Sequence, residues 1–240
     1  MKNPGMRENS DSRVSAAVSL LEEVVSEWLP ASFATSFGVE DMVILDLISR
    51  HAREIEVFTL DTGRLPEETY ALMSLVRERY PVRVRVYYPD TGTLERFVAL
   101  NGPNAFYDSI AQRRECCQIR KVDPLGRALG GKKAWVTGLR REQSPSRENL
   151  EIRAWDEANG LRKFSPLLEW TTGEVWGYIR DRSVPYNALH DTGYASIGCA
   201  PCTRAVAPGE DMRSGRWWWE ESATRECGLH TAKLPSQESQ

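Results

Sequence analysis

Five cysteines are the residues of this sequence whose type and spacing point most directly to chemistry. Cys116 and Cys117 are adjacent in the basic stretch "RRECCQIRK", which is predicted to be helical. Cys199 and Cys202 form the C-x-x-C sequence "CAPC", a spacing that lets two sulfurs reach one metal centre. Neighbouring helical residues point about 100° apart. Such divergent thiols suit the spread ligand positions of a 4Fe–4S cluster better than one small zinc ion, so these four cysteines are predicted to bind a cluster.

Three other interpretations of the four cysteines stay open at this point: a structural zinc site, a thioredoxin-like dithiol at "CAPC", and buried apolar side chains. A thioredoxin domain places its dithiol early, directly after a strand, whereas "CAPC" lies late in this chain. Lys121 lies near the adjacent pair, and its charge would compensate the negative charge of a thiolate-bound cluster.

The fifth cysteine, Cys227, lies in "TRECGLH" near the C-terminus and has no partner once the other four are used. Arg225 and His230 give it a partly cationic neighbourhood, which lowers the pKa of a thiol and raises its thiolate fraction. A single cysteine is more often structural, but the polar surroundings favour a reactive residue. Cys227 is therefore predicted to be a nucleophile.

The composition is that of an ordinary globular protein, with 240 residues, 41% hydrophobic and 27% charged. This length suits one α/β domain with an appendage. No apolar run approaches the roughly 20 residues of a membrane span. The first residues, "MKNPGMRENSDSR", show no apolar signal region, so we expect a cytoplasmic protein.

The net charge of −3 argues against general nucleic-acid binding. The arginines are nevertheless concentrated in three stretches, which span 113–121, 138–147 and 204–216. Local cationic clusters in a mildly acidic protein indicate a small, strongly anionic ligand, although each cluster alone is equally consistent with solvated surface charge.

Strands that alternate with helices predict a doubly wound, mostly parallel sheet. An apolar face with helical spacing spans 14–28, and a further helix is expected over 39–51. The predicted strands are "ASFATSF" (31–37), "EIEVFTLDTG" (54–63), the half-exposed or edge strand "VRVRVYY" (82–88) and "KAWVTG" (133–138). A hairpin with its turn at Asn159-Gly160 and a capped helix from Thr171 or Thr172 complete the pattern.

Three polar, glycine-containing loops follow predicted strands: "SFGVED" (36–41), "LDTGRL" (60–65) and "GLRREQSPSR" (138–147). In open α/β sheets ligands bind beyond the carboxyl ends of the strands, so these loops are expected to converge. The first loop opens a helix, and its backbone N–H groups, with Ser36 and Gly38, would hold a phosphate or sulfate. Forked guanidinium donors suit the same anions, and the candidates are Arg64, Arg140, Arg141 and Arg147.

These loops together resemble the adenine-nucleotide α-hydrolase, or PP-loop, fold. With the pattern CC…C-x-x-C…ECGLH added, nearly the whole chain resembles the assimilatory sulfonucleotide reductases, and specifically the bacterial iron–sulfur enzymes that act on adenosine 5′-phosphosulfate (APS). The resemblance implies a 4Fe–4S cluster on the four cysteines and Cys227 as the nucleophile. It also implies an S-sulfocysteine intermediate, release of AMP and sulfite, thioredoxin as the reductant, and a role in sulfate assimilation and cysteine biosynthesis.

The resemblance assigns individual roles by position. Lys121 is expected between the cluster and the substrate, Arg213 and Arg216 at the anionic groups of the nucleotide, and His230 at the substrate. Ser36, Gly38 and Asp41 belong to the anion loop, and Asp61 and Arg64 to the second loop. A sulfonucleotide-binding domain would span 1–205, and a mobile lid with Cys227 would span 206–240.

Three alternatives are kept. A 3′-phosphoadenylyl-sulfate (PAPS) reductase, or an enzyme that uses both substrates, is the nearest, although reductases restricted to PAPS generally lack the cluster cysteines. A PP-loop tRNA thiolation enzyme would need a strongly basic RNA face, and a non-catalytic iron–sulfur regulator would leave Cys227 unexplained. The oligomeric state, including a homo-oligomer, the physiological reductant and the electrostatic or redox role of the cluster stay open.

Overall fold

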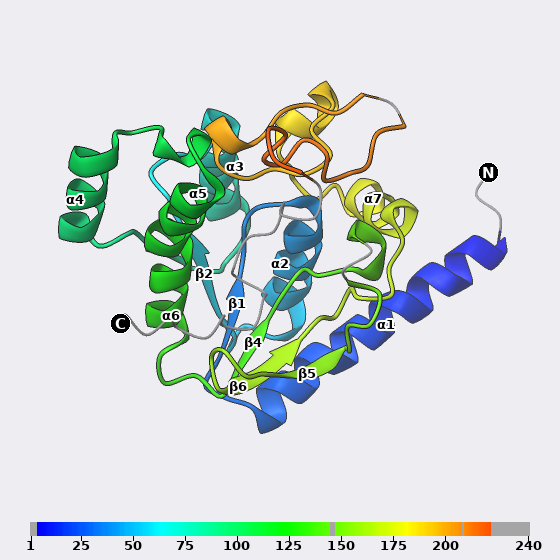
Figure 1. Ribbon diagram of the computed structural model, residues 1–240. Coiled ribbons are helices and arrows are strands. Elements are labelled where there is room, and N and C mark those ends of the chain that lie inside the picture. Colours follow the sequence, from blue (N-terminus) through cyan, green and yellow to red (C-terminus); the bar gives the residue numbers. More distant parts are fainter. Residues whose placement is uncertain (1–3, 145–146, 208, 222–240) are drawn as a thin grey trace.

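The computed structural model describes residues 4–144, 147–207 and 209–221, and it shows a six-stranded sheet with helices on both faces (Figure 1). The strand order is β3-β2-β1-β4-β6-β5, and only the β5–β6 pair is antiparallel. The strands are β1 (Ala31–Ala34), β2 (Glu56–Leu60), β3 (Val84–Tyr87), β4 (Ala134–Val136), β5 (Arg153–Asp156) and β6 (Leu161–Phe164). The predicted mostly parallel α/β fold is therefore confirmed, and the alternating strand is indeed at an edge.

Seven α-helices are described: α1 (Pro4–Glu27), α2 (Val39–His51), α3 (Glu67–Arg79), α4 (Thr91–Asn101), α5 (Ile110–Cys117), α6 (Asp123–Leu129) and α7 (Thr172–Asp181). The first helix begins before the predicted range of 14–28. Its apolar stripe starts only at Val14, so periodicity gave no signal for the earlier turns. The hairpin with Gly160 in its turn is confirmed, and Thr171 caps α7 through a capping box with Glu174.

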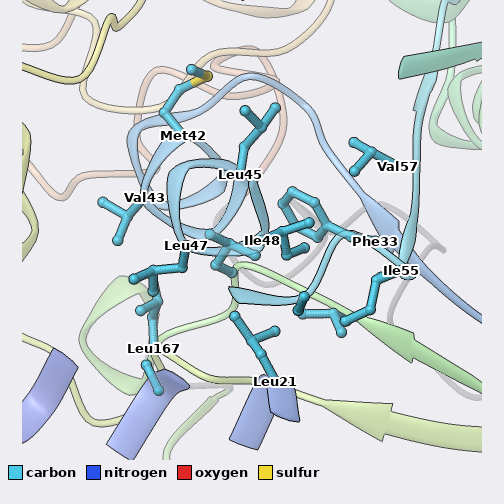
Figure 2. Close-up of a cluster of buried hydrophobic side chains, with 14 of the residues drawn as sticks. Leu21, Phe33, Met42, Val43, Leu45, Leu47, Ile48, Ile55, Val57 and Leu167 are labelled. Carbon is cyan, nitrogen blue, oxygen red and sulfur yellow. The ribbon is translucent and has the colours of Figure 1, made fainter. Parts of the chain in front are cut away.

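The alternation of side chains along the strands builds two apolar layers. Val57 on β2 packs into the large core formed with α1, α2 and α7, whereas its neighbour Phe58 packs on the opposite face with Leu125 of α6. Figure 2 shows part of the larger core, where Leu21 of α1, Ile48 of α2 and Leu167 meet beside the sheet. These layers fix β1, β2 and β4 side by side, with the loops after them at one end of the sheet.

A third apolar cluster contains the four cysteines. Phe97, Phe106 and Trp217 are buried in it together with these thiols. The helix that carries Cys116 and Cys117 continues into a π-helical turn, Gln118–Val122, before α6 begins. Such turns are often found at functional sites. In the part of the chain that the structure describes, no helix has both the length and the apolar character that crossing a membrane requires.

Candidate functional site

A cavity of about 230 Å³ opens at the carboxyl ends of the parallel strands. All three predicted loops contribute to its lining, through residues such as Ser36, Thr62 and Gly138. Two later segments, 195–198 and 212–217, complete the lining. The expected convergence of the three loops is therefore what the structure shows, because parallel strands bring their carboxyl ends to the same edge.

The first loop is shaped by a short hydrogen-bonded turn. Asp41, in the first turn of α2, accepts hydrogen bonds from the backbone N–H (2.5 Å) and the hydroxyl (2.7 Å) of Ser36. Burial nevertheless raises the pKa of Asp41 from its ordinary 3.8 to about 7. Gly138 passes so close that a Cβ there would overlap the Asp41 carboxyl, which explains the glycine at this position.

Four basic side chains line the cavity: Lys121, Arg147, Arg213 and Arg216. Arg216 is 7% exposed, and in the described structure no carboxylate lies within ion-pair distance of it. Among the described residues, its guanidinium makes only long bonds to Ser196 Oγ (3.3 Å) and Ile197 O (3.4 Å), and its Nε has no hydrogen-bond partner there. A buried, unneutralised guanidinium of this kind is a binding group for an anion.

The four cysteines Cys116, Cys117, Cys199 and Cys202 are buried, form no disulfides and line one small pocket of their own. Arg64, Arg113, Arg120 and Lys121 lie around the same pocket. The hydroxyl of Thr62 lies 3.2 Å from Cys199 Sγ. Among the described residues, no three Cys, His, Asp or Glu side chains are grouped closely enough to hold a single metal ion.

Burial controls the protonation of two of these thiols, Cys116 and Cys202. It raises the pKa of Cys116 and raises that of Cys202 to about 12, with the nearby cations opposing the shift only in part. Both thiols are therefore protonated at neutral pH unless a metal binds them. A reactive thioredoxin-like dithiol needs the opposite, a lowered thiol pKa.

Lys121 and Trp217 line both the cavity and the cysteine pocket, and they join the two into one site. Lys121 lies within the π-helical turn, and the same helical segment carries the adjacent cysteines. The resemblance predicts Lys121 at this boundary. Trp217 lies between two guanidinium groups, Arg113 at 5.0 Å and Arg216 at 4.8 Å from its ring centre.

Four predicted site residues do not line the cavity. Arg140 is buried and bonds Glu40, Glu142 and the Trp170 carbonyl instead.

The other three have similarly local partners. Arg141 pairs with Glu169, and Arg64 bonds Asn104 and the Pro103 carbonyl at the cysteine pocket. Asp61 accepts from Gly63 N and the Tyr70 hydroxyl, which shapes the second loop. These local contacts shape the loops around the cavity, and a substrate role for these four residues stays a prediction.

The predicted residues Cys227 and His230 lie outside the described residues.

Two site residues were missed from the sequence. Arg120 is buried, donates a hydrogen bond to the Thr62 carbonyl (2.5 Å) and contacts Cys116. Its position in "RRECCQIRK", close to the adjacent cysteines, was the sequence signal that could have identified it. His190 lines the cavity, and burial lowers its pKa, but no motif marks it.

A model of the phosphoadenosine phosphosulfate reductase domain matches residues 30–205 of this chain. The chain belongs to this family. The matched range includes the three loops and all four buried cysteines, whereas Arg213, Arg216 and Cys227 follow it.

Several curated relatives are similar over most of their length. The chain is 53% identical to adenosine 5′-phosphosulfate reductase of Allochromatium vinosum, over 91% of this chain and 85% of the relative. It is 47% identical to the protein of the same name from Burkholderia cepacia, over 90% and 86%. It is also 47% identical to the one from Neisseria meningitidis serogroup B, over 88% and 86%.

Solved structures of similar fold include the phosphoadenylyl-sulfate reductase of Candida auris in a phosphate complex. Its TM-score is 0.69 at 28% sequence identity, and the match covers 83% of this chain and 97% of that chain. An FMN adenylyltransferase of Candida glabrata in complex with ATP has a TM-score of 0.57 at 15% identity, over 91% and 75%. The second likeness shows that the reductase family shares its fold with other nucleotide-binding proteins.

Proposed function

We propose that the protein reduces adenosine 5′-phosphosulfate to sulfite and AMP, as an APS reductase of sulfate assimilation. One observation carries the proposal: a cavity lined by four cations shares Lys121 and Trp217 with a pocket of four buried thiols. The cavity suits an anionic nucleotide, and the relatives that are about half identical are named APS reductases.

The four cysteines fit a 4Fe–4S cluster. They are free thiols around one pocket, and burial keeps Cys116 and Cys202 protonated unless a metal is present. Arg64, Arg120 and Lys121 around the pocket balance the negative charge that thiolate ligation brings, whereas the charge of Arg113 is already paired with Glu220. The cysteines Cys116, Cys117, Cys199 and Cys202 would hold the cluster, which would supply electrostatic tuning near Lys121.

In the first chemical step, the Cys227 thiolate attacks the sulfur of the sulfate group. A new S–S bond forms, the bond from that sulfur to the phosphate oxygen breaks, and AMP leaves with the electron pair. The enzyme is left as S-sulfocysteine. Lys121 and Arg216 supply positive charge where the sulfate and the departing phosphate carry negative charge, which favours both binding and departure.

In the second step, a thiolate of thioredoxin attacks Cys227 Sγ, and sulfite leaves with the electron pair of the S–S bond. The second thioredoxin thiol then attacks the mixed disulfide and restores the Cys227 thiolate. The two electrons that reduce APS come from the thioredoxin dithiol, which becomes a disulfide. The covalent intermediate divides one difficult displacement into two easier ones.

The test compares sulfite release from APS and from PAPS by the anaerobically purified protein with thioredoxin present. We expect release from APS and little from PAPS. Equal release would replace the proposal with an enzyme for both substrates, which the name of the family and the Candida auris neighbour keep in view. Release from neither substrate would contradict the proposed function.

The cofactor has its own test. Anaerobically purified protein is expected to contain about four iron atoms per chain and to absorb broadly at about 400 nm, as thiolate-bound clusters do. A colourless protein with one zinc ion would contradict the cluster assignment while leaving the substrate comparison valid.

A further inference from the structure

A histidine in the cavity lining has one ring nitrogen without a hydrogen-bond partner. His190 lies in the short 3-10 helix Ala188–Thr192, and it lines the cavity. Its Nδ1 lies 2.7 Å from the backbone carbonyl oxygen of Tyr194. Its Nε2 is excluded from solvent and has no hydrogen-bond partner among the described residues. Buried polar atoms without a partner are rare in folded proteins, and each one calls for an explanation.

The contact at Nδ1 decides what the other ring nitrogen can do. A carbonyl oxygen only accepts hydrogen bonds, so Nδ1 carries the proton of the neutral ring and Nε2 carries a lone pair. Burial lowers the pKa of His190, which keeps the ring neutral at neutral pH. Nε2 is therefore a hydrogen-bond acceptor in a cavity whose four basic side chains are all donors.

The imidazole ring is held in place by two helices. Trp176 of α7 lies nearly perpendicular to it, with the ring centres 5.6 Å apart. Asn187, just before the 3-10 helix, donates to the Thr69 hydroxyl of α3 (2.9 Å). The contacts to α3 and α7 give the ring a defined position in the cavity wall.

The charges around this ring are of the wrong sign for an anion. The carboxylates of Glu40 and Asp191 act on His190 in the described structure. A lone pair beside carboxylates does not attract a phosphate or sulfate, whereas a neutral donor suits it. A nucleotide has two kinds of neutral donor, the ribose hydroxyls and the amino group of adenine.

The apolar lining of the cavity separates these two kinds of donor. Phe58, Leu125 and Trp135 line the cavity and belong to the apolar cluster on the α6 face of the sheet. Trp176, which contacts His190, packs instead against the core formed with α1, α2 and α7. An adenine ring suits the apolar α6 side, which leaves a ribose hydroxyl as the donor near His190.

We propose that His190 is a substrate-binding residue whose Nε2 accepts a hydrogen bond from a ribose hydroxyl of the bound nucleotide. The inference rests on the proposed function, and it adds recognition of the sugar to the contacts with anionic groups.

Such a contact makes the site selective for the hydroxyl. An analogue without that hydroxyl leaves the acceptor buried and unpaired, so its affinity falls. A phosphate in place of the hydroxyl also offers no donor at neutral pH, and it adds negative charge next to the lone pair. If the partner is the 3′ hydroxyl, His190 therefore helps to distinguish APS from PAPS.

Two substitutions of His190 separate the roles of its ring nitrogens. In His190→Asn the side-chain amide takes the place of Nδ1 and keeps the bond to the Tyr194 carbonyl, while Nε2 is lost. In His190→Gln the amide oxygen takes the place of Nε2. His51→Asn is the matched control, because His51 is exposed at the end of α2 and lies outside the cavity lining. All variants are compared as the anaerobic, cluster-containing full chain.

The measurement is the Kd, by isothermal titration, for AMP, 2′-deoxy-AMP, 3′-deoxy-AMP and purine riboside 5′-monophosphate, which lacks the amino group. We expect the wild type to bind one of the two deoxy analogues at least about fivefold more weakly than AMP. His190→Asn should weaken AMP binding by about the same factor and leave the affinity for that analogue unchanged. His190→Gln should lie between this variant and the wild type, and His51→Asn should match the wild type.

Three results would overturn the proposal. An unchanged affinity of His190→Asn for AMP would show that no contact exists. Equal losses for AMP and for both deoxy analogues would show that His190 only supports the cavity wall. An insensitivity confined to purine riboside 5′-monophosphate would assign Nε2 to the amino group of adenine instead.

If His190→Asn does not fold, nitrogen-15 NMR of the wild type decides. The chain has three histidines, so the signals of His190 are readily assigned. AMP should shift the Nε2 signal of His190 and the weakly bound deoxy analogue should not; no shift with AMP would overturn the proposal.

None of these measurements requires catalysis. If the wild type binds AMP but releases no sulfite from APS, the proposed function fails and the analogue comparison still decides the role of His190. A wild type that binds no AMP would contradict both proposals.

Discussion

Two buried arginines beside Trp217 have opposite electrostatic surroundings. Arg113 has a carboxylate at 2.7 Å, whereas Arg216 has none within ion-pair distance among the described residues. An unpaired buried charge opposes folding, and it is kept where a ligand supplies the missing charge. The contrast separates a residue that stabilises the structure from one that serves the cavity.

Arg216→Met is therefore expected to weaken AMP and sulfate binding at least about tenfold without lowering the unfolding temperature. Isothermal titration gives the first quantity and calorimetry the second. Arg113→Met is the matched control: it removes the buried cation that bonds Glu220 at two points, which costs about 3–5 kcal/mol, and its unfolding temperature should fall. An Arg216→Met protein that is several degrees less stable, with unchanged anion affinity, would assign Arg216 to the fold instead.

Asp41 makes the stability of the folded protein depend on pH, and the shift of its pKa determines the sign of that dependence. Its folded-state pKa of about 7 lies above its ordinary 3.8, because burial disfavours the charged carboxylate. A group whose pKa is higher in the folded than in the unfolded protein contributes its full stabilisation at pH values below its unfolded-state pKa. This contribution is lost as pH rises through its folded-state pKa. Over that window the loss is on the order of 4 kcal/mol.

Asp41→Asn, which cannot ionise, should remove this loss. Urea unfolding between pH 5 and pH 8 is expected to show the wild type losing its advantage over the variant as pH rises. Asp90→Asn is the control, because hydrogen bonds from Thr93 lower the pKa of the exposed Asp90, so its difference from wild type changes only below about pH 4. A constant difference between Asp41→Asn and wild type would show that Asp41 is ionised throughout.

At the scale of elements, local periodicity and capping signals predicted the strands and the helices α1, α2 and α7, whereas no such pattern predicted α4 or α6. The alternation of Val82, Val84 and Val86 with arginines indicated an edge strand. A capping residue at Thr171 or Thr172 indicated the start of α7. The π-helical turn after Cys117 was not predictable, since it differs from an α-helix by one hydrogen-bond register and leaves no mark in the apolar pattern. That turn places Lys121 at the boundary between the cavity and the cysteine pocket.

The glycines of α7 and of the third loop differ in a way that can be tested. A Cβ on Gly177 would meet no atom within 4 Å, so the glycine has only its entropic cost in the middle of a helix. Gly177→Ala should stabilise the protein by about 0.5–1 kcal/mol and leave activity unchanged. Thermal unfolding measures this, with Gly138→Ala as the opposite case, because its Cβ overlaps Asp41. A destabilised Gly177→Ala protein would mean that α7 is more closely covered there.

At the scale of the whole molecule, the location of the site was predictable because it follows from the topology of the sheet. The direction in which each side chain points was not predictable. Parallel strands made the three loops converge, as expected. The same reasoning assigned Arg140 and Arg141 to the ligand, yet they face Glu40 and Glu169. The Arg113–Glu220 pair joins positions so distant in sequence that no local pattern indicates it.

The cysteine cluster is separate from the two apolar clusters on the faces of the sheet, and this separation predicts a partial response to metal removal. The large core involves α1, α2, α7 and the sheet, whereas the cysteines belong to the small core with Phe106 and Trp217. Stripping the metal with a chelator should therefore release the segments around Cys199 and Trp217 and leave the sheet folded. We expect far-UV circular dichroism to be nearly unchanged while trypsin cleaves faster after Arg204 and Arg213.

Reconstitution with iron and sulfide under anaerobic conditions should restore the protection of both arginines, because the thiols then share one centre again. Cys227→Ser serves as the control, since it keeps the four ligands and should respond to chelation and reconstitution like the wild type. Global loss of secondary structure on chelation would show that the two cores unfold as one unit. Unchanged cleavage would show that the small core is held by its apolar contacts and by the Arg113–Glu220 pair alone.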